Sequence, residues 1–177
     1  YSSQTVAAYQ IAGRLDMLIF LPIFAIAGAM TTLVGMFYGG KKIIALNQVI
    51  KYGISSAFVI TMLSSAFIYF FAEYFSSFFT KDQEVISVSV KCLRFLSLVY
   101  PLVAIAITSG RVMQGLGRGL PVLVITIIRV LGVSAPLGIY FSFYLLKPVE
   151  WNWYAMIVAA IIAFIIAIFW VTYEIRK

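Results

Sequence analysis

The sequence contains no histidine, one cysteine and few charged residues. Only 11% of its 177 residues are charged, whereas about 25% of a soluble globular domain is charged. The lack of histidine excludes a histidine metal site and a histidine proton relay. Cys92 has no second cysteine to pair with, which excludes an internal disulfide. We therefore expect neither a metal centre nor a cofactor in this chain.

The motifs of enzymes are also missing. The chain has no GxxxxGK[ST] loop to hold a nucleotide phosphate, and no nucleophile–base constellation or metal set. We expect no enzymatic activity. The net charge of +7 does not indicate nucleic-acid binding, because the basic residues lie between hydrophobic runs rather than in one stripe.

Hydrophobic residues, in contrast, make up 63% of the chain. A helix needs roughly 20 apolar residues to cross a bilayer core about 30 Å thick. Five stretches reach that length, and short loops separate them. The predicted fold class is an all-α integral membrane protein in the lipid bilayer, with one domain over residues 1–177. Its five helices are expected at about residues 5–39, 52–79, 84–112, 120–146 and 151–174.

The charges in the loops predict how these helices cross the cell (plasma) membrane. Five crossings put alternate loops on opposite sides, and the side richer in lysine and arginine is cytoplasmic. We expect the N-terminus outside and the C-terminus in the cytoplasm. The cytoplasmic side would carry Lys41, Lys42, Lys51, Arg111, Arg118, Arg176 and Lys177 with one acid, Glu174, and the outer side Lys81 and Lys147 with Asp82, Glu84 and Glu150.

The stretch GRLDMLIFLP places Arg14 and Asp16 at the start of a long uncharged run. Residues two apart point to different sides of a helix, so this pair does not form a good ion pair. One interpretation puts both side chains in the headgroup region. The other puts them in a cavity, where Asp16 binds a cation or a proton. The residues alone leave both interpretations open.

Three more cations fall inside predicted helices. Lys91 and Arg94 share one helix face, and each either extends to the membrane surface or faces the bundle. Arg129 lies some 13 Å beyond Leu120, at about 1.5 Å per residue. One interpretation is that Arg129 fixes the structure through hydrogen bonds to backbone carbonyls or to an acidic side chain. The other is that it is part of a pathway through the membrane.

Three prolines, Pro22, Pro101 and Pro136, fall inside predicted spans. Each removes a backbone hydrogen bond and favours a kink. A kink in a membrane helix is either a fixed bend or a hinge, so these prolines are candidate hinges.

Three segments carry a more specific signal. Residues 6–42 read VAAYQIAGRLDMLIFLPIFAIAGAMTTLVGMFYGGKK, and residues 78–86 read FFTKDQEVI. Residues 94–130 read RFLSLVYPLVAIAITSGRVMQGLGRGLPVLVITIIRV, with APLGIYF following. In this order they resemble multidrug and toxic compound extrusion (MATE) transporters, in which AA, a following Arg, a proline and a VGQ..GA-like ending recur.

This resemblance implies a fold of twelve helices in two six-helix lobes around a cleft. The match covers helices eight to twelve, most of the C-terminal lobe, so helix seven and the N-terminal lobe would be missing partners. The opening YSSQTVAAYQIAG, without an initiator methionine, likewise suggests a piece of a longer protein. Arg14 and Asp16 would then lie within the eighth helix, near the cavity between the lobes.

The resemblance also implies a function: antiport, in which Na⁺ or H⁺ enters as coupling ion and cationic aromatic small molecules leave. The substrate or ion pathway would include Asp16, Arg14, Arg94 and Arg129. NorM-like members carry an acid on the tenth helix, whereas SVSVKCLRFLSLVYPLVAIAITSG has none. That difference favours the DinF-like branch, in which coupling runs mainly through the other lobe.

Two alternatives remain at this point. A lipid-linked oligosaccharide flippase of the same superfamily would have similar helices and a more basic cavity, consistent with Lys91, Arg94 and Arg129. A membrane scaffold subunit that transports nothing would also explain five hydrophobic spans.

Overall fold

The computed structural model describes residues 3–144 and 150–176, which form helices and no strand. The first two helices, of 37 residues each, are α1 (Ser3–Gly39) and α2 (Ile43–Phe79). The chain continues through α3 (Gln83–Ser97), α4 (Tyr100–Gly115), α5 (Leu120–Ile127), the π-helix η1 (Ile128–Ser134), α6 (Ala135–Ile139), the π-helix η2 (Tyr140–Tyr144) and α7 (Glu150–Arg176). The predicted all-α fold is confirmed.

Four of the helical stretches in the described ranges are long and apolar enough to cross a membrane. They are Gln4–Gly39, Ile43–Phe79, Leu120–Ser142 and Trp151–Glu174. The pair α3 and α4 adds a fifth span if the two bent helices are taken together. The hydropathy of the chain and its helical geometry therefore agree on as many as five crossings.

The second helix begins at Ile43, nine residues before the predicted start at Tyr52. The prediction was wrong because it counted only uncharged sequence and stopped at Lys51. Leu46 and Ile50 recur at helical spacing and are buried in one cluster with Met30 and Val34 of α1. Packing of that apolar stripe continues the helix through Lys51, whose side chain is exposed.

The third predicted helix, residues 84–112, is two helices with a bend of 52° between them. Asp82 caps α3, because its carboxylate accepts the backbone N–H groups of Glu84 and Val85. Pro101 stands in the first turn of α4 and has no N–H for the carbonyl of Ser97, four residues earlier. A continuous helix is therefore interrupted at residues 98–99.

The fourth predicted helix, residues 120–146, is helical throughout its described part but not uniformly α. Two π segments interrupt it, and the N–H of Ala135 bonds to the carbonyl of Val130, five residues back. The next residue is Pro136, which lacks an N–H, and a π turn is one way for a helix to accommodate such a gap. The predicted end at residues 145–146 lies outside the described residues.

The fifth predicted span is α7, which packs through small residues. Ala155, Ala159, Ala163 and Ala167 recur every four residues and are all buried. Such a stripe lets the helix approach α4 closely. Ala163 and Ala167 share a cluster with Met113 of α4.

Helices α1 and α4 cross at a second stripe of small groups. The Thr31 hydroxyl donates to the carbonyl of Arg111 at 3.3 Å. Gly115 lies so close to α1 that an added Cβ would stand 2.7 Å from the backbone oxygen of Thr31 and 2.8 Å from Cβ of Val34. The crossing therefore requires glycine at position 115.

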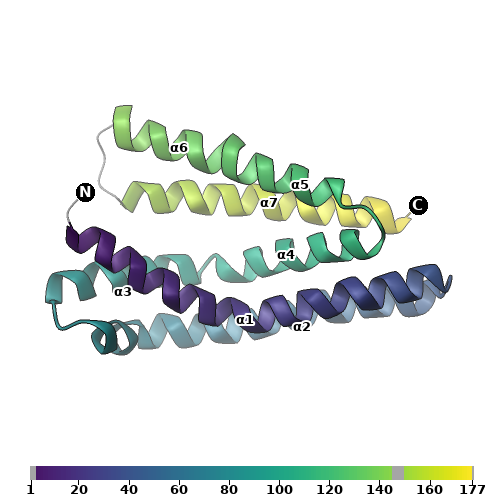
Figure 1. The fold of residues 1–177 in the computed structure, drawn as a ribbon, viewed down its shortest axis with the longest axis horizontal. Coiled ribbons are helices and arrows are strands. Elements are labelled where there is room, and N and C mark those ends of the chain that lie inside the picture. The colour runs from purple at the N-terminus through teal and green to yellow at the C-terminus, as the bar shows by residue number, and fades with distance from the viewer. Residues whose placement is uncertain (1–2, 145–149, 177) are drawn as a thin grey trace.

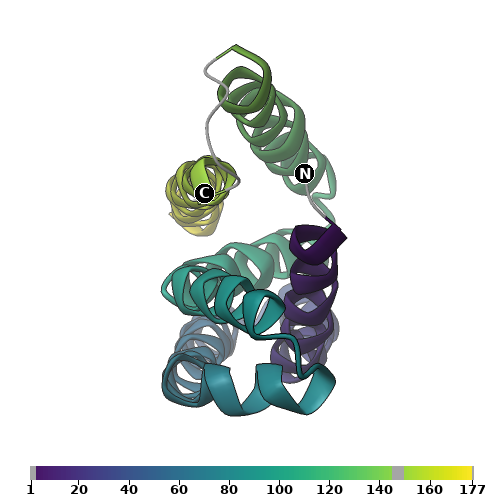
Figure 2. The same ribbon diagram turned by 90° about the vertical axis from the view of Figure 1, so that its left-hand side faces the viewer.

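Figures 1 and 2 show two groups of helices. Helices α1 to α4 form one group, and α5 to η2 together with α7 lie against it on one side. The two chain ends are at opposite ends of the long axis (Figure 1). The turns at residues 40–42 and 116–119 lie at the C-terminal end, where Arg118 forms an ion pair with Glu174 of α7.

Candidate functional site

The bend between α3 and α4 presents a tyrosine to the acid of α1. Tyr100 is the first residue of α4 and is 3% exposed. Its hydroxyl donates a hydrogen bond to the Oδ1 of Asp16, which is half-buried. The ring of Phe20, one turn further along α1, packs edge-on against the Tyr100 ring at 5.3 Å. Asp16 is thus held as an acceptor inside the bundle rather than at an exposed helix mouth.

A cavity of about 290 Å³ opens beside this pair. It lies between α1, the α3–α4 bend, η1 and α7, so the two helix groups form its opposite walls. Its polar groups are Asp16, Tyr100, Arg129 and Ser134, and the rest of the wall is apolar. Asp16 and Arg129, from segments far apart in sequence, therefore line one cavity.

A second cavity, of about 350 Å³, adjoins the first through Arg129, which lines both. It carries Arg111 and Gln114 of α4, and the Arg111 guanidinium donates to the Gln114 side chain at 3.0 Å. We call the two cavities together the central groove. The groove has one acid, Asp16, in the first cavity, while Arg129 lines both cavities and Arg111 lines the second.

Arg129 lies on η1 and is half-buried. Among the residues that the structure describes, no acid or carbonyl bonds its guanidinium. One interpretation of Arg129 is a structural role through bonds to helix-end carbonyls or an acid. The described residues contain no such bond. Arg129 instead presents its charge to the groove.

The other two predicted pathway residues do not line the central groove. Arg14 is exposed on α1. Arg94 is exposed on α3, where its Nε donates to the carbonyl of Tyr69 at 3.3 Å, and it lines a different pocket. The structure thus brings Asp16 and Arg129 together and leaves Arg14 and Arg94 apart from them. No observation tests a transport role for any of the four.

Tyr100 was not selected from the sequence, although a signal was present. The tyrosine directly precedes Pro101 in VYP, at a position where a proline-induced break turns the chain. Of the candidate hinges, Pro101 stands at the 52° bend, Pro22 lies inside α1 and Pro136 follows a π segment. Movement at these positions remains a prediction.

A bundle of apolar helices with ionisable groups lining a groove between them is an arrangement typical of polytopic transport proteins. The chain is a member of the MatE family, whose model matches residues 1–140. This match confirms the resemblance to MATE transporters. The family is one of multi-pass transporters of the plasma membrane.

Relatives and solved structures support the same assignment. A probable multidrug resistance protein NorM from Thermotoga maritima is 28% identical over 156 residues, which are 88% of this chain and 33% of the relative. A NorM protein from Bacillus cereus is 28% identical over 158 residues, 89% of this chain and 35% of the relative. The chain therefore spans about a third of the length of the curated relatives it matches.

Two solved structures have nearly the same fold. An outward-facing multidrug resistance MATE family transporter of the MOP superfamily superposes with a TM-score of 0.91 at 27% identity. A MOP superfamily transporter from Pyrococcus furiosus, described as having a binding pocket of reverse polarity, gives 0.90 at 26% identity. Each alignment covers 98% of this chain and 39% of the other. The comparisons give no support to a flippase or a scaffold subunit.

Proposed function

We propose that this chain works as most of the C-terminal lobe of a secondary active multidrug efflux antiporter. The antiporter exports cationic aromatic compounds in exchange for Na⁺ or H⁺. The observation that carries the proposal is the central groove, in which the Asp16 carboxylate, bonded by Tyr100, and the Arg129 guanidinium line one intramembrane cavity. The likeness to multidrug MATE structures and NorM proteins supports it.

Asp16 is the group we assign to cation binding. A carboxylate at membrane depth is poorly solvated, so a cation that enters the groove is attracted to it strongly. The Tyr100 hydroxyl occupies one oxygen, Oδ1, and leaves the other for a cation. Phe20 and the Tyr100 ring supply an aromatic wall beside the charge, which suits a flat aromatic cation.

Arg129 has the opposite role. Its positive charge lines the same cavity as Asp16 and also the next cavity along the groove. A cationic substrate is attracted by Asp16 and repelled by Arg129, so the groove holds it at one place and disfavours passage further along. Neutralisation of Asp16 by a coupling ion would remove the attraction and leave the repulsion, which favours release.

The bend at Pro101 connects this site to conformational change. Tyr100 is the residue at the bend, so straightening or closing of α3 against α4 would move its hydroxyl relative to Asp16. Alternating access in transporters moves one unit against another around a shared site. We propose that the other unit is a second lobe, since the matched structures extend well beyond this chain.

Transport by the full-length protein and by this chain alone tests the proposal. In proteoliposomes, we expect the full-length protein to move a cationic dye when a Na⁺ or H⁺ gradient is applied. The chain alone should show no saturable flux, because it supplies one of the two units. Gradient-driven, saturable dye flux from the chain alone would contradict the two-lobe mechanism, and no flux from the full-length protein would contradict the antiporter.

The same proposal includes an orientation, with the C-terminal end of the bundle in the cytoplasm. Lys42 and Lys81 are exposed lysines in loops at opposite ends, and Cys92 is buried. In a Cys92→Ala background, an impermeant thiol reagent added to intact cells should label Lys81→Cys and leave Lys42→Cys unlabelled until the cells are opened. The reverse pattern would invert the topology.

A further inference from the structure

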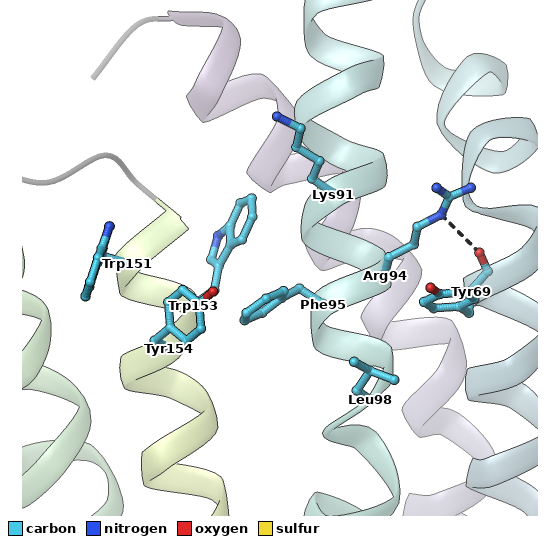
Figure 3. Close-up of a pocket in the computed structure, with 8 residues that line it drawn as sticks. All are labelled: Tyr69, Lys91, Arg94, Phe95, Leu98, Trp151, Trp153 and Tyr154. Carbon is cyan, nitrogen blue, oxygen red and sulfur yellow. Dashed lines mark hydrogen bonds between the residues drawn. The ribbon is translucent and has the colours of Figure 1, made fainter.

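A second pocket lies away from the central groove, at the end of the bundle where α7 begins. It has a volume of about 640 Å³ and shares no lining residue with the central groove. Figure 3 shows its eight lining residues, which come from α2, from α3 and the residue that follows it, and from α7. We call it the aromatic groove; its lining comprises Tyr69, Lys91, Arg94, Phe95, Leu98, Trp151, Trp153 and Tyr154.

The charge of the aromatic groove has one sign. Lys91 and Arg94 lie one turn apart on α3, and no acid is among the described lining residues. Both side chains extend toward the end where α7 begins (Figure 3). The Arg94 guanidinium is held over the Tyr69 ring at 5.7 Å and by the 3.3 Å bond to the Tyr69 carbonyl. The groove therefore carries two cations: Arg94, which Tyr69 holds on the α2 side, and Lys91, whose side chain extends away from α2 (Figure 3).

The rest of the groove is aromatic and apolar. Phe95 packs against Trp153 at 5.8 Å and against Tyr154 at 4.9 Å, which joins α3 to α7. Leu98, which directly follows the last residue of α3, lies about one turn beyond Phe95 and is 68% exposed. An apolar chain that entered below the two cations would run along Phe95 and Leu98.

The depth of Lys91 matches the boundary of a membrane, and Arg94 lies about 4.5 Å deeper on the same helix. Helix α2 has 37 residues, about 55 Å at 1.5 Å per residue, against a hydrocarbon core of about 30 Å. A centred bundle thus extends about 12 Å beyond the core at each end. Lys91 lies eight residues after Gln83, the first residue of α3, which is also about 12 Å. Trp151 and Tyr154, at the start of α7, are placed as an interfacial belt.

One donor in the groove has no acceptor. Trp153 is 3% exposed, and its Nε1–H bonds to no atom of the described chain. A buried indole N–H usually finds a partner. Ester and phosphate oxygens of a lipid are acceptors of the kind that this donor lacks.

We propose that the aromatic groove binds an anionic phospholipid. Its phosphate lies at Lys91 and Arg94, and an acyl chain lies along Phe95 and Leu98. A lipid headgroup with its attached chain would contact both the two cations and the aromatic walls at the membrane boundary. A free anion would contact the cations alone and leave the apolar part of the groove unfilled. This site does not depend on the proposed transport function.

Tryptophan fluorescence offers a direct test, since two of the three tryptophans line the groove. Trp170→Phe removes the third, and the chain is then titrated in neutral detergent with phosphatidylglycerol or phosphatidylcholine brominated in the acyl chains. Bromine quenches only tryptophans that the chains approach. We expect phosphatidylglycerol to quench at concentrations about tenfold lower or more, because each basic residue at a membrane surface favours anionic lipid.

Lys91→Gln combined with Arg94→Gln should abolish that difference. The matched control, Lys41→Gln with Lys42→Gln, removes two exposed lysines at the other end and should preserve it. Circular dichroism checks the helix content of each variant, and Lys91→Gln alone replaces the double variant if the latter unfolds. Equal quenching by the two lipids in the parent, or an unchanged difference in the variant, overturns the proposal. Release of the quenching by millimolar inorganic phosphate would assign the site to a free anion instead.

Discussion

Asp16→Asn in the full-length transporter is expected to lower export of cationic dyes about tenfold or more, the effect of losing roughly 1.4 kcal/mol of cation binding. Asparagine keeps the size of the side chain and its acceptor for the Tyr100 hydroxyl, but it removes the charge. The measurement is dye efflux from energised cells, normalised to the amount of protein in the membrane. Arg14→Gln is the matched control, because Arg14 lies on the same helix and is exposed.

Export of neutral substrates by the Asp16→Asn variant distinguishes between two roles of this carboxylate, binding of the drug and binding of the coupling ion. If Asp16 meets the drug directly, neutral compounds should be exported almost as before. If it meets the coupling ion, export of neutral and cationic compounds should fall equally. Export at the parental level for both classes would remove Asp16 from the pathway and leave Arg129 as the remaining ionisable candidate between the two cavities.

Gly115→Ala is expected to destabilise the chain by about 1–3 kcal/mol. The added Cβ would meet the backbone oxygen of Thr31 at 2.7 Å and Cβ of Val34 at 2.8 Å, and neither is able to move without shifting α1. For a chain of this size, that loss corresponds to a melting temperature lower by about 3–10 °C. Thermal unfolding in detergent, followed by circular dichroism, measures it.

Another glycine, on α1, serves as the control for this substitution. A Cβ at Gly28 would meet nothing within 4 Å. Gly28→Ala should therefore unfold within a few degrees of the parent. If Gly115→Ala unfolds at the same temperature as Gly28→Ala, the close crossing of α1 and α4 does not stabilise the bundle.

The spans were predictable because a bilayer imposes a length on hydrophobic sequence, and that length is read within a window of about 20 residues. Runs such as residues 17–40 satisfy this condition without any tertiary contact. Helix ends were less predictable. The start at Ile43 depends on the burial of Leu46 and Ile50 against α1, which hydropathy does not report.

The candidate site was predictable only in part. Asp16 and Arg129 could be predicted as site residues because an ionisable side chain is costly in hydrocarbon and, where it occurs in a membrane span, usually has a function. Nothing in the sequence indicated that they share a cavity, or that Arg94 lies with Tyr69 in a different pocket. The face to which a charge points depends on neighbouring helices, and no residue carries that information alone.

The sequence by itself determined that this protein is an all-α membrane protein of the MatE family with as many as five crossings, since composition and the order of local motifs are properties of the chain. Tertiary structure decided which of its charges line the same cavity. The bond between Asp16 and Tyr100 joins residues 84 positions apart, and it forms because the break at Pro101 turns Tyr100 toward α1. Contacts of that kind arise only when helices pack, because packing and not sequence proximity brings their side chains within reach of one another.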